Sequence, residues 1–144
     1  MRKFITKSEE ETLAAAAELA KSLKAGDVIL YGGEMGAGKT AFTKGIARCL
    51  EVDDEVTSPT FALVHEYNGR IPLFHFDLYR INGYDDLYAV GFFDYLDRGG
   101  IIAAEWSENV EGLESELGGV IRINIEKLSE NERKITVTGG VFGE

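Results

Sequence analysis

One glycine-rich segment, Gly33 to Thr40, constrains the fold of this 144-residue chain more than any other feature. Its sequence, Gly-Glu-Met-Gly-Ala-Gly-Lys-Thr, fits the pattern G-x-x-x-x-G-K-[ST] at every fixed position. In such a loop the backbone N–H groups and the positive end of the following helix point at phosphate oxygens. Lys39 would reach the β- and γ-phosphates, and the Thr40 hydroxyl would ligate Mg²⁺. The segment therefore predicts a site for a nucleoside triphosphate, most simply ATP.

The sequence on both sides of this segment supports the same interpretation. The apolar run from Val28 to Tyr31 is typical of a buried strand, and a helix is expected from about Lys39 to Leu50. The motif requires this strand–loop–helix order. The order argues against a glycine-rich turn that contains a lysine by chance.

Hydrophobic periodicity and turn residues predict the remaining elements. Ser8 and Glu11 have the spacing of a capping box, which should start a helix that ends at Gly26. Further strands are expected at Phe61–Tyr67, Ile71–Tyr79, Ile101–Ala104, Val120–Ile125 and Ile135–Val137, and further helices at Tyr84–Leu96, interrupted near Gly91, and at Asn109–Leu117. We therefore predict a single P-loop domain over residues 1–144. Its α/β fold should have a central mixed sheet, with a parallel core and antiparallel hairpin additions, flanked by helices.

Hydrolysis needs an acidic residue near the metal in addition to the phosphate loop. Two carboxylates come at the ends of apolar runs, where parallel strands should place them near the loop. Glu105 directly follows Ile101–Ala104, and Asp77 comes late in the run that starts at Leu73. Either residue alone could be an ordinary surface acid at a strand end.

The segment Thr57-Ser58-Pro59-Thr60 lies where GTPases carry a switch, between the loop helix and the hairpin. Its hydroxyls could meet the γ-phosphate or Mg²⁺, and a simple turn into a strand is an equally good interpretation. His65 and His75 are interpreted as strand residues, because their spacing suits no metal site. The chain lacks an Asn-Lys-x-Asp element, so nothing favours guanine.

Charge and composition exclude several classes of protein. A net charge of −10 argues against a free-standing nucleic-acid binder, which would normally carry a basic face. With one cysteine, Cys49, no intrachain disulfide can form, and a reducing compartment is favoured. No segment approaches the ~20 apolar residues of a membrane span, and the first residues lack the apolar run expected of a signal peptide. We expect a cytoplasmic protein that does not bind membranes.

Taken together, the motifs resemble those of the TsaE (YjeE) family, the bacterial ATPase of tRNA threonylcarbamoyladenosine biosynthesis. The resemblance depends on four segments in one order: Gly33–Thr40, Thr57–Phe61 (Thr-Ser-Pro-Thr-Phe), His75–Arg80 (His-Phe-Asp-Leu-Tyr-Arg) and Glu105-Trp106. It covers nearly the whole chain, and the combination is far more specific than the phosphate loop alone. Ser107 and Ala41 depart from the proline and threonine that are common in the family, and neither touches a presumed metal or phosphate contact.

The resemblance implies a weak ATPase that acts with a TsaD–TsaB pair. TsaD transfers the threonylcarbamoyl group to adenosine 37 of tRNAs reading ANN codons, and the ATPase supports repeated rounds without transferring the group itself. A protein that docks on such a pair need not grip tRNA directly, which is consistent with its acidic charge.

The resemblance also implies roles for individual residues. Lys39, Asp77 and Glu105 would be catalytic, Thr40 and Glu105 would hold Mg²⁺, and Thr57, Ser58, Pro59 and Thr60 would be switch-like. The role of Arg80 stays open. The expected contacts to ATP or ADP are Thr6, Gly33, Glu34, Met35, Gly36, Ala37, Gly38, Lys39, Thr40, Ala41, Trp106 and Arg133.

Two other functions use the same loop. A small-molecule kinase generally needs a lid with several arginines, whereas the seven arginines here are scattered along the chain. A regulatory module would sense ATP without hydrolysing it, and Asp77 and Glu105 argue against that alternative.

Overall fold

A mixed sheet carries every strand of the part of the chain that the structure describes. The computed structural model describes residues 1–34, 36–53, 56 and 63–144. The strand order is β1-β7-β6-β2-β5-β4-β3. Four parallel strands form its centre: β6 (Ile121–Lys127), β2 (Val28–Gly32), β5 (Ile101–Glu105) and β4 (Leu73–Asp77). Antiparallel strands β7 (Arg133–Thr138) and β1 (Arg2–Thr6) extend one side, and β3 (Val64–Tyr67) extends the other. This confirms the predicted α/β fold with a parallel core and antiparallel additions.

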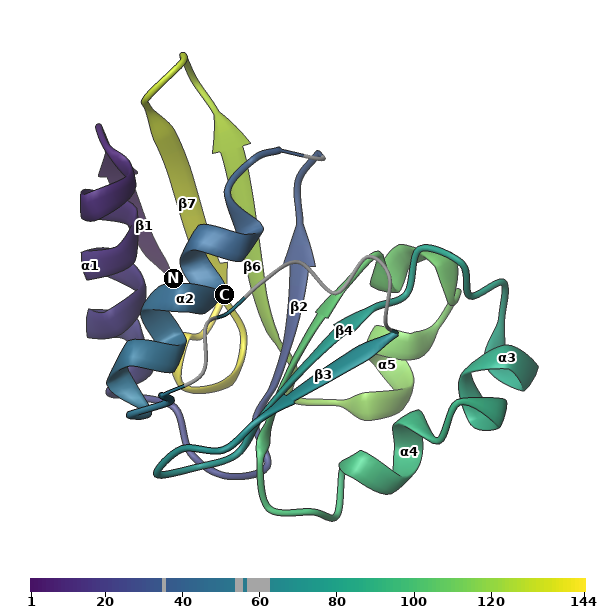
Figure 1. The fold of residues 1–144 in the computed structure, drawn as a ribbon. Coiled ribbons are helices and arrows are strands. Elements are labelled where there is room, and N and C mark those ends of the chain that lie inside the picture. The colour runs from purple at the N-terminus through teal and green to yellow at the C-terminus, as the bar shows by residue number, and fades with distance from the viewer. Residues whose placement is uncertain (35, 54–55, 57–62) are drawn as a thin grey trace.

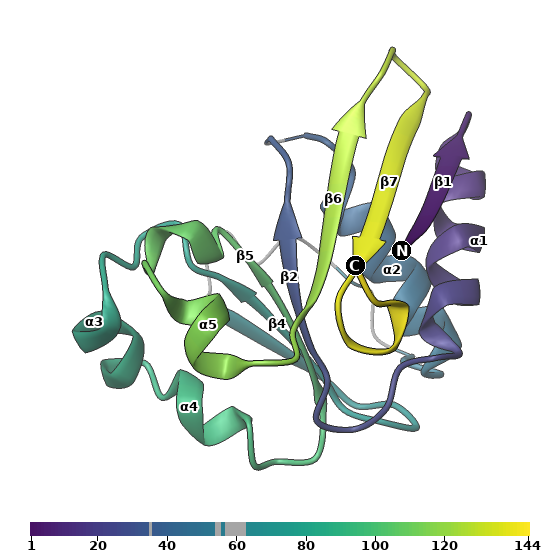
Figure 2. The same cartoon turned by 180° about the vertical axis from the view of Figure 1, so that it is seen from behind.

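Helices cover both faces of this sheet (Figures 1 and 2). Helices α1 (Glu9–Ala20) and α2 (Lys39–Cys49) lie on one face, and α3 (Tyr84–Ala89), α4 (Phe92–Tyr95) and α5 (Leu113–Leu117) lie on the other. The alternation of side chains along β2 explains the two layers. Ile29 and Tyr31 pack among α1 and α2, whereas Leu30 packs with Leu87 of α3 and Phe92 of α4. Within the described ranges, none of the helices is long and apolar enough to cross a bilayer.

The first helix begins as predicted and ends earlier than predicted. The Ser8 hydroxyl accepts a hydrogen bond from the Glu11 N–H at 3.1 Å, and the Glu11 carboxylate accepts one from the Lys7 N–H. The expected end at Gly26 was wrong, because α1 stops at Ala20 and short turns follow. Gly26 instead adopts a φ of 95° in the loop before β2, where its N–H bonds to the Gly100 carbonyl.

The predictions for the second half of the chain hold with shifted boundaries. The hairpin is confirmed, since His65 of β3 pairs with His75 of β4, although residues 61 and 62 of the predicted strand lie outside the described residues. Gly91, with a φ of 78°, separates α3 from α4. The helix expected from Asn109 was displaced, because Gly112 takes a left-handed conformation and α5 begins after it.

Candidate nucleotide site

The loop between β2 and α2 has the backbone conformation that its glycines permit. Gly33, Gly36 and Gly38 have φ values of 121°, 81° and 115°, a region that L side chains rarely adopt. A Cβ atom at Gly33 would also collide with the carbonyl oxygen of Ile125 on β6. Close approach to β6 and the left-handed backbone therefore both require glycine here. Met35 of the motif lies outside the described residues.

Positive charge gathers where this loop enters α2. Lys39 begins the helix and is only 6% exposed. Its Nζ lies 4.9 Å from the centroid of the Trp106 ring, a cation–π contact. The unpaired N–H groups of the first turn, where Thr40 also lies, give the helix start a partial positive charge. The loop is therefore suited to an anion.

A buried hydroxyl pair connects the start of α2 to the strand beneath it. The Thr43 hydroxyl donates to the Lys39 carbonyl at 2.8 Å, so the Tyr31 hydroxyl must donate the 2.7 Å bond between Tyr31 and Thr43. Burial raises the pKa of Tyr31 well above its usual range, and the charge of Glu105 raises it further.

The two predicted acids meet at one end of the sheet. Asp77 and Glu105 are the last residues of β4 and β5 and lie opposite each other in the parallel register. They are at the carboxyl ends of the strands, the same end at which β2 leads into the phosphate loop. Asp77 Oδ1 accepts a bond from the Tyr79 N–H at 3.0 Å, which commits one of its oxygens to the turn. Asp77 and Glu105 therefore both lie at the end of the sheet that carries the phosphate loop.

A contact that sequence reasoning missed involves Glu105. His75 Nε2 lies 2.7 Å from Glu105 Oε2, with the histidine fully buried and the Glu105 side chain 13% exposed. Within the described part of the chain, the buried Nδ1 of His75 has no hydrogen-bond partner, which costs about 1–3 kcal/mol. The available signal was the spacing of His75 and Asp77, because residues two apart share one face of a strand.

Trp106 holds an unusual conformation directly after Glu105. Its φ of 64° is left-handed, and a bulky residue there costs about 1–3 kcal/mol unless its surroundings hold it. The Tyr79 ring packs edge-on at 5.1 Å between centroids, and the Leu78 N–H bonds to the Glu105 carbonyl. These contacts hold the indole against Lys39.

Arg133 joins the phosphate loop to the turn between β6 and β7. Its Nε donates to the Ala37 carbonyl at 2.8 Å. Its Nη1 donates to three carbonyls of that turn, those of Ser129, Glu130 and Glu132. The guanidinium therefore fixes one peptide of the loop and adds positive charge beside it.

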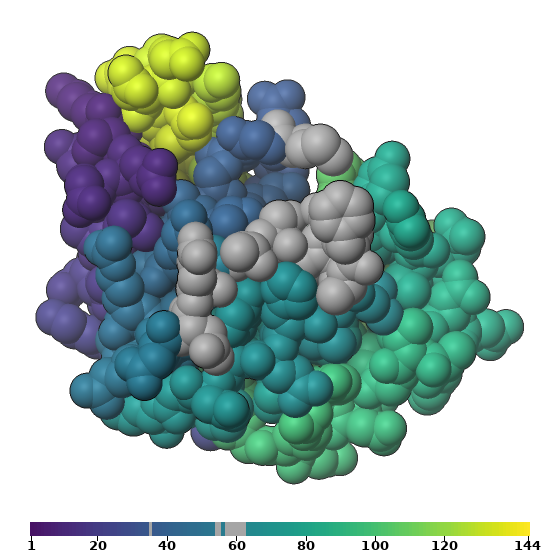
Figure 3. All heavy atoms as spheres, viewed as in Figure 1, coloured from purple at the N-terminus to yellow at the C-terminus, as the bar shows by residue number. Residues whose placement is uncertain are grey.

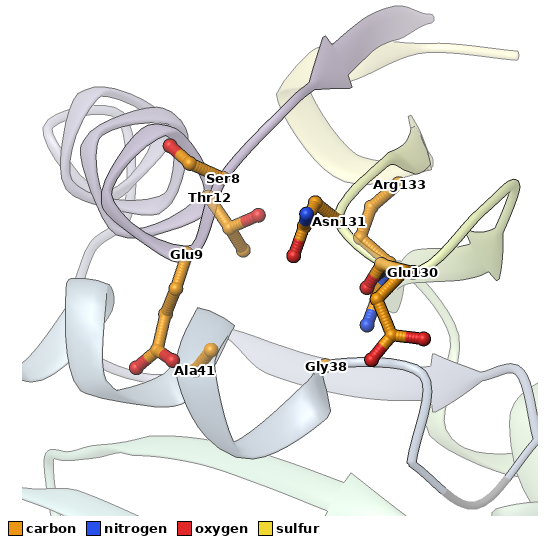
Figure 4. Close-up of a pocket in the computed structure, with 8 residues that line it drawn as sticks. All are labelled: Ser8, Glu9, Thr12, Gly38, Ala41, Glu130, Asn131 and Arg133. Carbon is orange, nitrogen blue, oxygen red and sulfur yellow. Dashed lines mark hydrogen bonds between the residues drawn. The ribbon is translucent and has the colours of Figure 1, made fainter.

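A cavity of about 190 Å³ lies beside Arg133, between the starts of α1 and α2 and the β6–β7 turn (Figures 3 and 4). In Figure 3 these segments, distant in sequence, meet on one face, in purple, blue and yellow. Thr6 does not line this cavity. Its hydroxyl bonds to that of the lining residue Thr12 at 2.7 Å. The lining residues are Ser8, Glu9, Thr12, Gly38, Ala41, Glu130, Asn131 and Arg133.

The remaining predicted positions are less enclosed or outside the described structure. Glu34 and Arg80 are exposed. The candidate switch, Thr57, Ser58, Pro59 and Thr60, lies outside the described residues. The structure thus brings together the phosphate loop, Lys39, Thr40, Asp77, Glu105, Trp106 and Arg133.

The groups present fit a magnesium ion that arrives with nucleotide phosphates. Among the described residues, no three His, Cys, Asp or Glu side chains form a metal cluster. Mg²⁺ keeps several waters and often needs only one or two protein ligands plus phosphate oxygens. The bond from His75 occupies Oε2 of Glu105, so Oε1 is the carboxylate oxygen left for a cation. The Thr40 hydroxyl would supply a second oxygen.

Comparison with known proteins gives one consistent result. The sequence profile described as threonylcarbamoyl adenosine biosynthesis protein TsaE matches residues 6–135. The chain is 39% identical over 137 residues to tRNA threonylcarbamoyladenosine biosynthesis protein TsaE of Bacillus subtilis, covering 94% of this chain and 84% of the relative. The protein of the same name from Aquifex aeolicus is 39% identical over 140 residues, covering 95% and 96%. The crystal structure of Bacillus subtilis YdiB superimposes with a TM-score of 0.78 at 36% identity, over 96% of this chain and 84% of that one.

Proposed function

This chain belongs to the TsaE family of tRNA threonylcarbamoyladenosine biosynthesis, and we propose that within this pathway it is a Mg²⁺-dependent ATPase. The observation that carries the proposal is the meeting of two features at one end of the sheet. The phosphate loop leaves β2 there, and Glu105 ends the neighbouring parallel strand, held by His75. A phosphate loop beside a strand-end carboxylate is the basic arrangement of P-loop nucleotide hydrolases.

In this proposal the loop binds the phosphates of ATP. The backbone N–H groups of Gly36 and of Gly38 to Thr40, at the start of α2, would attract the phosphate oxygens. Lys39 is the ammonium that would move from the Trp106 ring to the β- and γ-phosphates. Arg133 supports this loop through its bond to the Ala37 carbonyl.

Thr40 and Glu105 are the groups that would hold Mg²⁺. When bound, the ion neutralises the charge that develops on the phosphoryl oxygens during transfer. Asp77 is assigned to the same catalytic centre, where its Oδ1 is fixed by the Tyr79 N–H and its other oxygen would orient a water molecule.

The cavity beside Arg133 is the proposed site of the nucleobase of ATP or ADP. Its volume of about 190 Å³ suits one ring system rather than a whole nucleotide, and it opens beside Gly38 and Ala41 at the start of α2. Ser8, Thr12 and Asn131 offer hydroxyl and amide groups to the edge of a purine. Thr6 would act through its bond to Thr12.

We further infer a single domain over residues 1–144 that works in the cytoplasm with TsaD and TsaB. The net charge of −10 favours docking on a protein partner over a direct grip on tRNA. We expect weak hydrolysis of ATP by the protein alone and a changed rate of hydrolysis when the partners are present.

Substituting Glu105 with Gln distinguishes an ATPase from a protein that only senses ATP. Glu105→Gln should bind ATP and hydrolyse it about 100-fold more slowly, because the cation loses its carboxylate. Glu126→Gln, an exposed change on β6, is the matched control and should hydrolyse ATP normally. Unaltered turnover in Glu105→Gln would refute the assignment of Glu105.

A further inference from the structure

A single histidine contacts the proposed cation ligand from within the sheet. His75 lies on β4 opposite Ala103 of β5, and Glu105 is two residues beyond Ala103 on the same face of the sheet. The small Ala103 side chain leaves room for the imidazole to reach diagonally to the Glu105 carboxylate. The resulting bond, Nε2 to Oε2 at 2.7 Å, links a fully buried ring to a carboxylate at the edge of the site.

Packing alone does not account for a histidine at this position. The neighbouring residues of β4, Leu73, Phe74 and Phe76, are buried and apolar, as is usual in a central parallel strand. An apolar ring would fill the same space without leaving a polar atom unsatisfied. In the described part of the chain, the Nδ1 of His75 is buried without a partner, which weakens the core.

The bond to Glu105 fixes what the imidazole can do. A carboxylate accepts hydrogen bonds, so Nε2 carries the proton and Nδ1 is left without one in the neutral ring. A glutamate has several rotatable bonds, and a hydrogen bond to one oxygen selects among its rotamers. With Oε2 held by His75, Oε1 is the oxygen that takes no part in this bond.

We propose that His75 is a positioning residue that holds Glu105 in the orientation needed to ligate the nucleotide-bound cation. This inference rests on the proposed function, because it assumes that Glu105 ligates Mg²⁺. His75 acts through Glu105 and contacts neither nucleotide nor cation. Groups that orient metal ligands in this way typically change metal affinity by about 10–100-fold when removed.

Three substitutions at His75 separate a positioning role from a packing role. In His75→Gln the amide nitrogen replaces Nε2 and can still donate to Glu105. In His75→Asn the amide nitrogen takes the place of Nδ1, which does not reach Glu105. His75→Phe keeps a ring and removes both nitrogens. His65→Phe supplies the matched control, since His65 lies one strand away and bonds to Tyr67 instead.

The measurement is Mg²⁺ binding to the ADP-saturated protein by calorimetry, with ADP binding in EDTA recorded separately. We expect Mg²⁺ affinity to fall about tenfold in His75→Phe and His75→Asn, and to be largely retained in His75→Gln. Affinity for ADP without metal should be unchanged in all three. Thermal unfolding of His75→Phe should stay near the wild-type temperature, because removal of the unsatisfied Nδ1 offsets loss of the bond to Glu105.

Failure of this inference can be distinguished from failure of the proposed function. Suppose that Glu105→Gln binds Mg²⁺ weakly, as the proposed function requires. Normal Mg²⁺ affinity in His75→Phe, or equal Mg²⁺ affinity in His75→Asn and His75→Gln, would then show that His75 only fills space. Normal Mg²⁺ affinity in Glu105→Gln would remove the cation role of Glu105 and with it that of His75. If the proposal holds, the double variant His75→Phe/Glu105→Gln should bind Mg²⁺ no more weakly than Glu105→Gln.

Discussion

The residues of this site differ in how well the sequence alone predicts their positions. Lys39 and Thr40 occupy fixed positions of a motif, so their place at the start of α2 follows from the pattern. Glu105 and Asp77 were predicted from apolar runs that end in acids, and both lie at the expected end of the sheet. The bond from His75 was not predicted, because it joins residues 30 positions apart whose pairing depends on the strand order.

Arg133 provides a test at the residue scale. Replacing it with Gln removes the charge-assisted bond to the Ala37 carbonyl, and such bonds contribute about 1.5–3 kcal/mol. ADP affinity, measured by calorimetry, should therefore fall about tenfold or more. Lys134→Gln, one residue along β7, removes the same charge without touching the loop and should bind ADP normally. Equal affinity in the two variants would show that Arg133 does not support the loop.

Among the elements, α1 and α2 depend on a close approach at one glycine. A Cβ atom at Gly45 would come within 2.5 Å of the Ala16 Cβ and of the Leu13 carbonyl oxygen. Gly45→Ala should therefore lower the free energy of unfolding by about 1–3 kcal/mol, despite the better helix propensity of alanine. Urea unfolding measures this. Gly83→Ala, where a Cβ meets nothing within 4 Å, should change stability far less, and an equal loss in both would contradict close packing of the helices.

The contact between α5 and β6 predicts that the free energy of unfolding depends on pH. Arg122 donates two bonds to Glu114, with Nε to Oε1 at 3.2 Å, and this hydrogen bonding lowers the pKa of the Glu114 carboxyl. A lowered pKa in the folded state stabilises the protein above the unfolded pKa of about 4.3, and this stabilisation disappears as pH falls through the folded value.

Both side chains of this pair are partly exposed, so its contribution should stay below about 1 kcal/mol. Urea unfolding of Glu114→Gln should show this loss near pH 7, and the loss should shrink as pH falls below the unfolded value of about 4.3. Glu116→Gln, on the same helix, serves as the control. A deficit of Glu114→Gln that persisted at acidic pH would assign the effect to packing rather than charge.

At the scale of the whole molecule, the sequence predicted most of the architecture and less of the site. Periodicity and turn residues located the strands and the hairpin because these signals are local. The end of α1 at Ala20 and the start of α5 at Leu113 were not predicted. Several glycines can each bound a helix, and tertiary contacts decide which of them does. The order of strands brings Arg133 to Ala37, across 96 positions, and no local pattern encodes such a contact.

We propose that this chain hydrolyses ATP as part of a threonylcarbamoyl-transferring assembly. The most direct test is the rate of ATP hydrolysis by the pure protein, alone and with the TsaD–TsaB pair, with Lys39→Ala as the control. We predict slow hydrolysis alone, a clear change of rate when the pair is added, and loss of both in Lys39→Ala. A rate that is the same with and without the pair would contradict the coupling, and a rate that survives in Lys39→Ala would contradict the site.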